Sequence, residues 1–391
     1  MREYVEENKI PTELIHKLQD TPVTIIGNPP YLDILLANVV GLGVENIFLY
    51  QGAGFDNSSL DEGSSTKGIN CINDINLFGK DCVTHFEVTY KLVTVTPIDK
   101  IPESFVINAS THDVDRDIGN LFLYADKDKS LVSTKPLPAV QSDFINGSVI
   151  SALAVDEFRK HFFRISEIDT PQDLILYNPL IQKGLYPKET FRSNKNPKIL
   201  MVGAGGIGNY CGVACAKEGY NVHVVDGDVY ENKNLHRQMF CKVGDAKAQR
   251  LCSVVKDAFG LDWTHEHAYL DENYPVENFD VILGCVDNIR TRKILQQLSV
   301  EKGIPYLDGG VEASFGQVTY KRPIQGEDEP VLEDGSCLTK PNPSVIMTNC
   351  IIGNHMAKAI PFILESAIGY RFSYSCEYSQ RINEEFYDRA K

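Results

Sequence analysis

Apolar runs alternate with amphipathic stretches in the second half of the chain. The run KILMVG leads into a glycine turn, and NYCGVACAKEG follows with apolar positions at helical spacing. A second apolar run, NVHVVDGD, comes next. FDVILGCVDN and IPYLDGG are further candidates for buried strands, separated by the helical segment RTRKILQQLSVEKG. The pattern predicts a doubly wound α/β fold.

The first half of the chain repeats this pattern. TPVTIIGNPPYLDILLANVVGLGVENIFLYQGAGFDNSSL aligns with the second-half motif, with Gly27 opposite Gly203 and Leu60 opposite Leu235, offsets of 176 and 175 residues. PESFVINAST then falls opposite NFDVILGCVD, and NGSVISALAVDEFRKHF resembles NPSVIMTNCIIGNHMAKAI after an insertion. Any two α/β halves share strand and helix periods, but four segments in the same order favour a duplication.

Two tandem Rossmann-like doubly wound domains are therefore expected, over residues 1–165 and 196–391. The segment 166–195 between them carries the Pro, Asp and Ser signals of a linker. A chain of 391 residues with 43% hydrophobic content is long enough for two cores.

Charge and cysteine usage narrow the class of protein. A formal net charge of -15 argues against non-specific binding to nucleic acid or anionic membranes. The charged N-terminal stretch MREYVEENKI lacks the apolar core of a secretory signal, and no apolar run is long enough to span a bilayer. Ten cysteines without a CxxC pair fit a reducing compartment. We expect a cytoplasmic protein.

The glycine turn of the second half, GAGGIG, indicates a nucleotide site. Its glycines, Gly203, Gly205, Gly206 and Gly208, let an anion approach the backbone N–H groups at a helix N-terminus. Asp226 ends the next strand, where an acidic side chain accepts hydrogen bonds from ribose hydroxyls. These features fit NAD, FAD and ATP alike, and a solvated loop aspartate is the alternative for Asp226.

The residues that follow separate these nucleotides. NLHRQ places Asn234, Arg237 and Gln238 after the second strand, and VGDAKAQ places Lys247 near the start of the next helix. Converging cations suit the concentrated negative charge of a triphosphate. Asp287 ends the strand FDVILGCVDN, where it would hold Mg²⁺ or, alternatively, cap the following helix.

Together, GxGGxG, the DxD of Asp226 and Asp228, NLxRQ, GxxKA and the strand-terminal DN resemble the ThiF/MoeB/HesA-type activating-enzyme superfamily. That superfamily includes enzymes of sulfur-carrier pathways and the adenylation domains of ubiquitin-activating enzymes. The resemblance covers roughly residues 196–365, including GGVEASFGQVTYKRP. It implies that Asp226 binds the ATP ribose, that Asn234, Arg237 and Lys247 handle the phosphates, and that Asp287 binds Mg²⁺.

The first copy lacks the residues that are expected to bind ATP and Mg²⁺ in the second. It reads GNPPYL in place of GAGGIG, and prolines without N–H groups cannot cradle a phosphate. The second-copy residues Asp226, Asn234, Arg237 and Asp287 are matched there by Gln51, Ser59, Glu62 and Thr111. We expect a degenerate first domain.

The resemblance also suggests partners. Family members work as dimers or as active and inactive pairs, so the two halves are expected to form an intra-chain pseudo-dimer, with a further homodimer as a second option. In the family a partner arginine from an N-terminal helix reaches the ATP site, and Arg2 is the candidate here. A solvated terminal charge is the alternative for Arg2.

Two departures from the family bear on function. Many members hold zinc through two CxxC pairs, whereas the corresponding stretch EDEPVLEDGSCLTKPNPS supplies only Cys337, so structural zinc is expected to be absent. Cys337 is either an acyl-accepting thiol or a bystander. The spacing from Arg237 to Lys247 is also tighter than in typical members.

The resulting hypothesis is an ATP- and Mg²⁺-dependent enzyme that adenylates a carboxylate on a peptide or small protein. A compact, zinc-free member resembles enzymes that mature ribosomally made peptides of the microcin and pantocin type, and so antibiotic biosynthesis is the first prediction. Activation of a ubiquitin-like or sulfur-carrier protein is the close alternative. An NAD-dependent oxidoreductase, or a binding module with two degenerate halves, is more distant.

Overall fold

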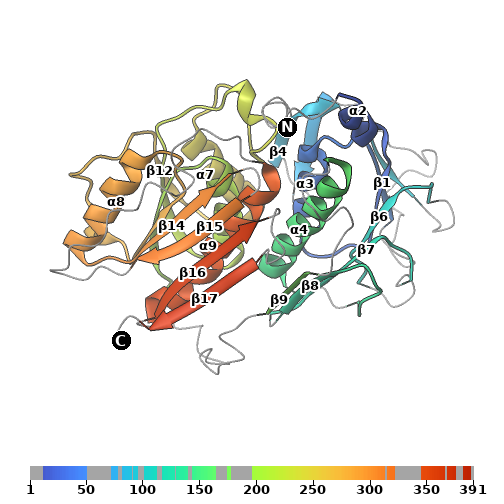
Figure 1. Ribbon diagram of the computed structural model, residues 1–391. Coiled ribbons are helices and arrows are strands. Elements are labelled where there is room, and N and C mark those ends of the chain that lie inside the picture. The colour runs from blue at the N-terminus through green and yellow to red at the C-terminus, as the bar shows by residue number, and fades with distance from the viewer. Residues whose placement is uncertain are drawn as a thin grey trace. The chain divides into compact units, whose positions relative to one another are not determined.

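The computed structural model describes the following residues (Figure 1): 12–50, 72–77, 82–89, 91–95, 101–111, 117–127, 129–139, 143–163, 174–177, 196–312, 315–321, 345–365, 368–375 and 382–388. The chain divides into two compact units. One holds Met1–Ile75 and His85–Asn178, and the other holds Asn76–Thr84 and Pro179–Lys391.

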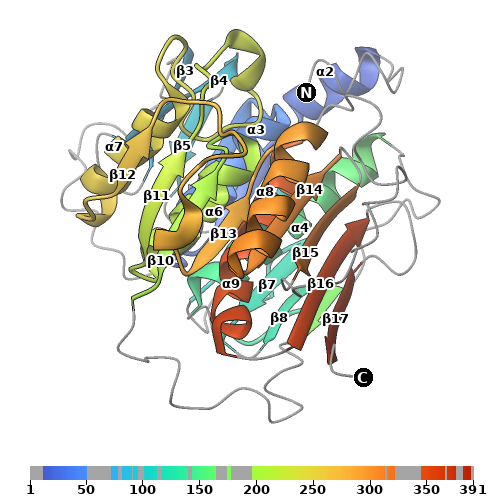
Figure 2. The ribbon, with the colours of Figure 1, turned by 90° about the vertical axis from the view of Figure 1, so that its left-hand side faces the viewer.

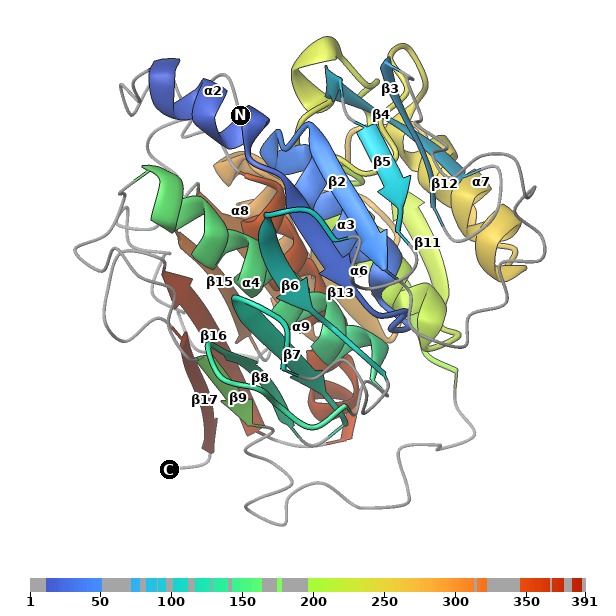
Figure 3. The same ribbon diagram turned by 90° about the vertical axis from the view of Figure 1, so that its right-hand side faces the viewer.

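The first unit is built on a seven-stranded sheet in the order β5-β2-β1-β6-β7-β8-β9. The five strands β5 to β7 of that order run parallel, and β8 and β9 are antiparallel to their neighbours. Helices α3 and α4 pack against each other on one face of this sheet (Figure 3). The bounds are α2 Thr12–Asp20, β1 Val23–Ile26, α3 Leu32–Leu42, β2 Asn46–Tyr50, β5 Lys91–Thr94, β6 Phe105–Asn108, β7 Leu121–Ala125, β8 Lys129–Ser133, α4 Phe144–Phe163 and β9 Leu174–Tyr177.

The second unit is built on an eight-stranded sheet in the order β12-β11-β10-β13-β14-β15-β16-β17. The strands β12 to β14 of that order run parallel, and the last three are antiparallel. Helices α6, α7 and α9 lie on one face and α8 on the other (Figure 2). The bounds are β10 Lys198–Val202, α6 Gly206–Lys217, β11 Asn221–Val225, η4 Asn232–Asn234, α7 Lys247–Phe259, β12 Thr264–Glu266, η5 Val276–Asn278, β13 Val281–Gly284, α8 Ile289–Lys302, β14 Tyr306–Val311, β15 Phe315–Lys321, α9 Ile346–Glu365, β16 Ile368–Ser375 and β17 Ile382–Asp388.

The sheets confirm the α/β fold class and share one strand order. In the first sheet β1, which leads into the turn at Gly27, lies between β2 and β6. In the second sheet β10, which leads into the turn at Gly203, lies between β11 and β13, the strands at the matching repeat positions. Both units then add antiparallel strands on the same side. A duplication predicts such a match, because connection order is more specific than strand periodicity.

Apolar sequence explains why these elements form. All four residues of β1 and of β13 are buried, as expected of parallel strands covered on both faces. Helix α6 is buried from Ile207 to Ala216, and α3 is buried at nearly every position. Helices with apolar residues on every side occur where both sides of the helix are covered. No described helix combines the length and the apolar content that crossing a bilayer requires.

The segment between the two predicted domains contains a strand. The strand β9 lies within residues 166–195, which the composition predicted to be a linker, and it pairs antiparallel with β8 from Lys129↔Tyr177 to Val132↔Leu174. The first sheet therefore continues at least to Tyr177. In addition, β3 (Ile72–Leu77) and β4 (Cys82–Thr89) form a separate two-stranded sheet.

Candidate functional site

The glycine turn after β10 crosses the end of β13 at very close range. Gly203 has φ of +97°, which side chains other than glycine rarely adopt, and a Cβ placed on it would lie 2.5 Å from the carbonyl oxygen of Cys285. Its N–H donates to the Val225 carbonyl at 2.9 Å. The turn is therefore fixed between β11 and β13, at the carboxyl edge of the sheet where α/β proteins bind ligands.

Helix α6 begins directly after this turn, with Gly205 as its N-cap. A Cβ on Gly206 would lie 2.6 Å from the side-chain nitrogen of Asn349, and one on Gly208 would lie 2.2 Å from the Gly203 carbonyl oxygen. A Cβ on Gly205, by contrast, would meet only the Gln238 amide nitrogen, at 3.6 Å. Gly206 and Gly208 are thus required by packing, whereas Gly205 keeps the space beside the helix N-terminus open.

Gln238 supplies a second sign of a ligand at this helix N-terminus. Its side chain is 4% exposed, and its amide oxygen accepts no hydrogen bond among the described residues. Buried polar atoms almost always have partners, so one left over beside an open helix N-terminus suits a bound polar group. The N-terminal N–H groups and dipole of α6 favour an anion there.

Asp226 lies where the sequence placed it, at the end of β11. One carboxylate oxygen accepts the Ala204 N–H at 2.6 Å and the other accepts the Asp228 N–H at 2.8 Å. Burial raises the pKa of this carboxyl, and the two backbone hydrogen bonds offset that rise only in part. Each oxygen retains lone-pair capacity, which is what a pair of ribose hydroxyls requires.

Asp228 and Lys247 form an ion pair beside it. The ammonium of Lys247 donates to one oxygen of Asp228 at 2.8 Å, and the hydroxyl of Tyr269 donates to the other at 2.8 Å. The Lys247 side chain is 10% exposed and that of Asp228 is 50% exposed. Burial alone would raise the pKa of Asp228, but the bonds from Lys247 and Tyr269 lower it. The structure thus joins Asp228 to Lys247 and gives it a protein partner on each oxygen.

Asn234 and Arg237 occupy the turn after η4. The Asn234 side-chain oxygen accepts the Glu231 N–H at 2.9 Å, which completes a capping box, and the residue is 2% exposed. The N–H groups of Arg237 and Gln238 both donate to the Asn234 carbonyl at 3.1 Å. Asn234 therefore has a clear role in shaping this turn. Direct contact of Asn234 or Arg237 with phosphates stays a prediction.

Asp287 follows β13 and is exposed. The alternative that it caps the next helix is wrong, because Asn288 is the N-cap of α8 and its side chain accepts the Thr291 N–H at 2.8 Å. No group of three metal-binding side chains occurs among the described residues. The exposed carboxylate of Asp287 fits Mg²⁺ held by one carboxylate together with nucleotide phosphates, which is a usual way for proteins to hold this ion.

Two predicted residues, Arg2 and Cys337, lie outside the described residues. Six cysteines whose burial the structure describes are all buried: Cys211, Cys215, Cys241, Cys252, Cys285 and Cys350. Burial raises the pKa of Cys241 and of Cys252 to about 12, so neither is a thiolate at neutral pH. Any acyl-accepting thiol must therefore be sought elsewhere in the chain.

Comparison with known proteins assigns this site to a family. Residues 177–364 match the ThiF family model. The chain carries a ThiF family domain. Within residues 177–364 lie β10 to β15, α6 to α8, α9 up to its last residue, and the glycine turn, Asp226, Asp228, Lys247 and Asp287.

Curated relatives match the same region. The chain is 34% identical over 169 residues to an adenylyltransferase and sulfurtransferase MOCS3 of Caenorhabditis briggsae, covering 40% of each chain. It is 31% identical over 166 residues to the SUMO-activating enzyme subunit uba-2 of Caenorhabditis elegans, covering 40% of this chain and 28% of the relative. A third relative is the adenylyltransferase and sulfurtransferase uba4 of Aspergillus niger, 30% identical over 173 residues, covering 41% and 35%. The chain thus spans well under half the length of these relatives.

The ThiF domain also contains residues that the sequence reading missed. Asn209 on α6 is fully buried; its amide donates to the Ala204 carbonyl at 2.9 Å and to the Tyr230 hydroxyl at 3.2 Å. Its oxygen accepts the Phe240 N–H at 3.2 Å. An Asn inside an otherwise apolar helix was the available signal, because buried amides are retained where they satisfy backbone groups.

A buried ion pair supports the loop that carries Asp287. Arg292 on α8 donates to Asp308 at 2.7 Å, to the Val286 carbonyl at 2.5 Å and to the Gly309 carbonyl at 2.8 Å. Both charged side chains are 4% exposed. The sequence signal was Asp308 within the apolar strand YLDGG, since a buried carboxylate needs a cationic partner.

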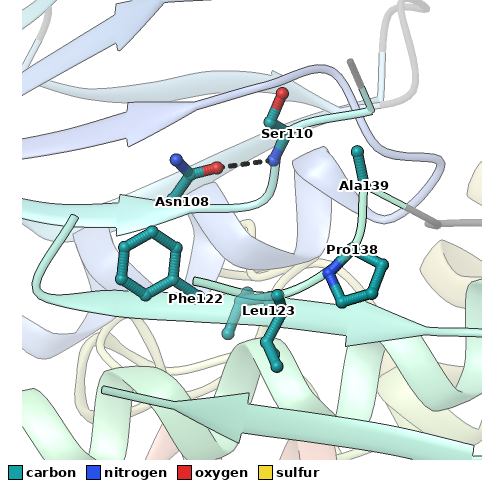
Figure 4. A pocket seen from close by; sticks show the side chains of 7 residues that line it. Asn108, Ser110, Phe122, Leu123, Pro138 and Ala139 are labelled. Carbon is teal, nitrogen blue, oxygen red and sulfur yellow. Dashed lines mark hydrogen bonds between the residues drawn. The ribbon is translucent and has the colours of Figure 1, made fainter. Parts of the chain in front are cut away.

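The first unit differs at the equivalent helix start. Tyr31, the N-cap of α3, is fully buried, and a Cβ added to Gly147 of α4 would collide with its ring. At the end of β6 the described residues line a hollow with about 190 Å³ of empty space that includes open solvent. Figure 4 shows the Asn108 side chain in that hollow, accepting the Ser110 N–H at 2.9 Å.

Proposed function

We propose that the ThiF domain is an ATP-dependent adenylating enzyme that activates the C-terminal carboxylate of a small ubiquitin-like or sulfur-carrier protein. The proposal rests on one observation: the residues that match the family model include the residues of the candidate nucleotide site. Residues 177–364 contain the open N-terminus of α6 as well as Asp226, Lys247 and Asp287. The names of the relatives, adenylyltransferases and a SUMO-activating enzyme subunit, support both the reaction and the substrate class.

In the proposed reaction a carboxylate oxygen of the carrier attacks the α-phosphorus of ATP. The bond from that phosphorus to the bridging oxygen of pyrophosphate breaks, and an acyl-adenylate forms. The protein's task is to position the reactants and to stabilise phosphoryl charge, so no protein nucleophile is required.

The described residues suit separate parts of this task. Asp226 would accept the ribose hydroxyls, and the first N–H groups of α6, with the side-chain N–H group of Gln238 near Gly205, would donate to phosphate oxygens. Lys247, paired with Asp228, supplies a cation whose charge acts on Asp226. Mg²⁺, held by Asp287 and the phosphates, would neutralise charge on the departing pyrophosphate.

The relatives support a carrier protein rather than a ribosomally made peptide as the substrate. Their names refer to adenylyl transfer, sulfur transfer and SUMO activation, and peptide maturation finds no support among them. The carrier alternative of the sequence reading is therefore preferred here over its first prediction. An NAD-dependent oxidoreductase would leave Lys247 and Asp287 without a task.

We further propose that the first unit has no ATP site of its own and that the two units form an intra-chain pseudo-dimer. The buried Tyr31 and the two prolines before it support the first part, because they take the place of the open glycines around α6. The shared strand order supports the second. A contribution of Arg2 to the ATP site stays a prediction.

The test is ATP–pyrophosphate exchange by the full chain. We expect exchange to depend on a carrier protein that ends in Gly-Gly and to disappear when the last glycine is removed. Exchange with a Glu-rich precursor peptide, and none with the carrier, would instead support peptide maturation. Binding of nicotinamide dinucleotides without ATP turnover would contradict adenylation altogether.

A further inference from the structure

Lys247 occupies an electrostatically unfavourable position. It is the first residue of α7, where the helix dipole presents its positive end, and cations are disfavoured there. Asp228 compensates: it accepts the Lys247 ammonium at 2.8 Å, and its carbonyl accepts the Lys247 N–H at 3.1 Å. One residue therefore binds both the backbone and the side chain of the lysine.

Tyr269 fixes the orientation of that carboxylate. Its hydroxyl donates to the Asp228 oxygen that Lys247 does not use, at 2.8 Å. With one oxygen bonded to Tyr269, the other is left facing the ammonium. A lysine side chain is a flexible point charge, so its place is set by the group that holds it.

The Tyr269 ring is itself held in place although it is 78% exposed. A Cβ on Gly227 would lie 2.8 Å from atoms of the ring, so the ring packs directly on the backbone between Asp226 and Asp228. The hydrogen bond of its hydroxyl and the packing of its ring therefore order a side chain that is otherwise mostly exposed. The position of the ring depends on Gly227 having no side chain.

We infer that Tyr269 is a positioning residue for the proposed adenylation: through Asp228 it holds the Lys247 ammonium where the phosphates of ATP will contact it. This rests on the proposed function, since it assumes that Lys247 meets a triphosphate. Preorganising a flexible cation lowers the ordering cost of binding, and this gain applies only to ligands whose phosphates reach that cation. Tyr269 therefore influences ATP binding more strongly than AMP binding.

The experiment measures binding to the full chain by calorimetry, with a non-hydrolysable ATP analogue and with AMP. We expect Tyr269→Phe to weaken binding of the ATP analogue about ten-fold, the lower end for one lost hydrogen bond to a charged group, and to leave AMP binding nearly unchanged. In a Lys247→Gln background the same change should have no further effect. Gly227→Ala, which displaces the ring, should reproduce the Tyr269→Phe result.

Tyr274→Phe is the matched control. It removes a hydroxyl from the same loop, one that donates to Glu266 at 3.1 Å rather than to Asp228, and we expect unchanged affinity for both nucleotides. Equal weakening of ATP and AMP binding by Tyr269→Phe, full additivity with Lys247→Gln, or no change would overturn the inference and leave the proposed function standing. If the unsubstituted chain binds no ATP analogue, the proposed function fails as well.

Discussion

The turns Gly27–Leu32 and Gly203–Gly208 start in the same way and end differently. Gly27 has φ of +112° and Gly203 of +97°, and a Cβ on either would collide with a carbonyl oxygen of the neighbouring strand, that of Ala109 at 2.3 Å or of Cys285 at 2.5 Å. Their N–H groups donate to Tyr50 and Val225, which are also matched positions, at 2.7 and 2.9 Å. The crossing of strand and turn is therefore a property of the fold.

After this shared glycine the two turns differ. In the first unit a tyrosine at the helix start fills the space against α4, whose Gly147 makes room for it. In the second unit the glycines are on α6, and the larger side chain, Asn349, comes from α9. The same backbone turn is therefore filled by a side chain when the helix after it begins with a large residue, as with Tyr31 of the first unit. It stays open when the small residues are on that helix itself, as with the glycines at the start of α6.

Asp287 and Thr111 are matched positions after β13 and β6. Substituting each of them gives the sharpest test of whether only the second unit binds ATP. We expect Asp287→Ala to reduce ATP–pyrophosphate exchange about 10³-fold, because a metal ligand at the phosphates is lost. Thr111→Ala should leave exchange within about two-fold of the unsubstituted rate. Circular dichroism serves as the folding control, and comparable losses in both variants would refute the division of roles.

Tyr31→Ala tests whether the first turn is closed by packing. Removing a fully buried ring should lower the free energy of unfolding by about 3–5 kcal/mol, because the surrounding helices cannot fully collapse into the cavity. Urea unfolding followed by fluorescence measures this. At temperatures where the variant is folded we expect it to gain no second ATP site, and two nucleotides bound per chain would contradict the proposed degeneracy.

Gly206→Ala and Gly205→Ala separate packing from ligand access in the second turn. A Cβ on Gly206 meets Asn349, so we expect a loss of about 1–3 kcal/mol of stability, which Asn349→Ala should largely restore. A Cβ on Gly205 has no atom closer than 3.6 Å, so stability should hold while ATP binding weakens roughly ten-fold through obstruction of the helix N-terminus. Thermal melts and calorimetry measure the two effects, and a destabilised Gly205→Ala would contradict the open site.

The pH dependence of binding should be the smallest effect. The raised pKa of Asp226 means that its carboxylate becomes protonated above the ordinary value of 3.8, so ATP affinity should fall as the pH is lowered through that higher range. Because the folded-state pKa is raised, the contribution of Asp226 to stability is full below 3.8 and is lost as the pH rises through the folded-state value. Titrations of ATP analogue binding between about pH 4 and 8 test the first statement, with Asp226→Asn as the variant expected to lack this dependence.

Sequence reasoning found the fold because strand and helix periods and the repeat offset are local or regular signals. The structure places the glycines, Asp226 and Gln238 of the predicted site at the start of α6 and joins Asp228 to Lys247 in an ion pair, while their binding roles stay predictions. Their spacing along one βαβ unit determines where they meet.

What it missed depends on contacts between distant segments. Tyr269 reaches Asp228 across 41 residues, and Arg292 reaches Asp308 across 16 residues to brace the loop before Asp287. Neither pairing leaves a periodic trace in the sequence. The alternative that Asp287 caps α8 could not be decided from the sequence, since Asp287 and Asn288 are both good N-caps and only geometry distinguishes them.

Asn209 ties three segments into one mechanical unit. Through a single carboxamide, the glycine turn at Ala204, the strand extension at Tyr230 and the chain just after Gln238 share hydrogen bonds. A shift in the segment that bears Arg237 and Gln238 must therefore also displace the turn at the start of α6. A nucleotide bound at that turn would consequently act on all three segments together, and a mutation in any one of them would disturb the others.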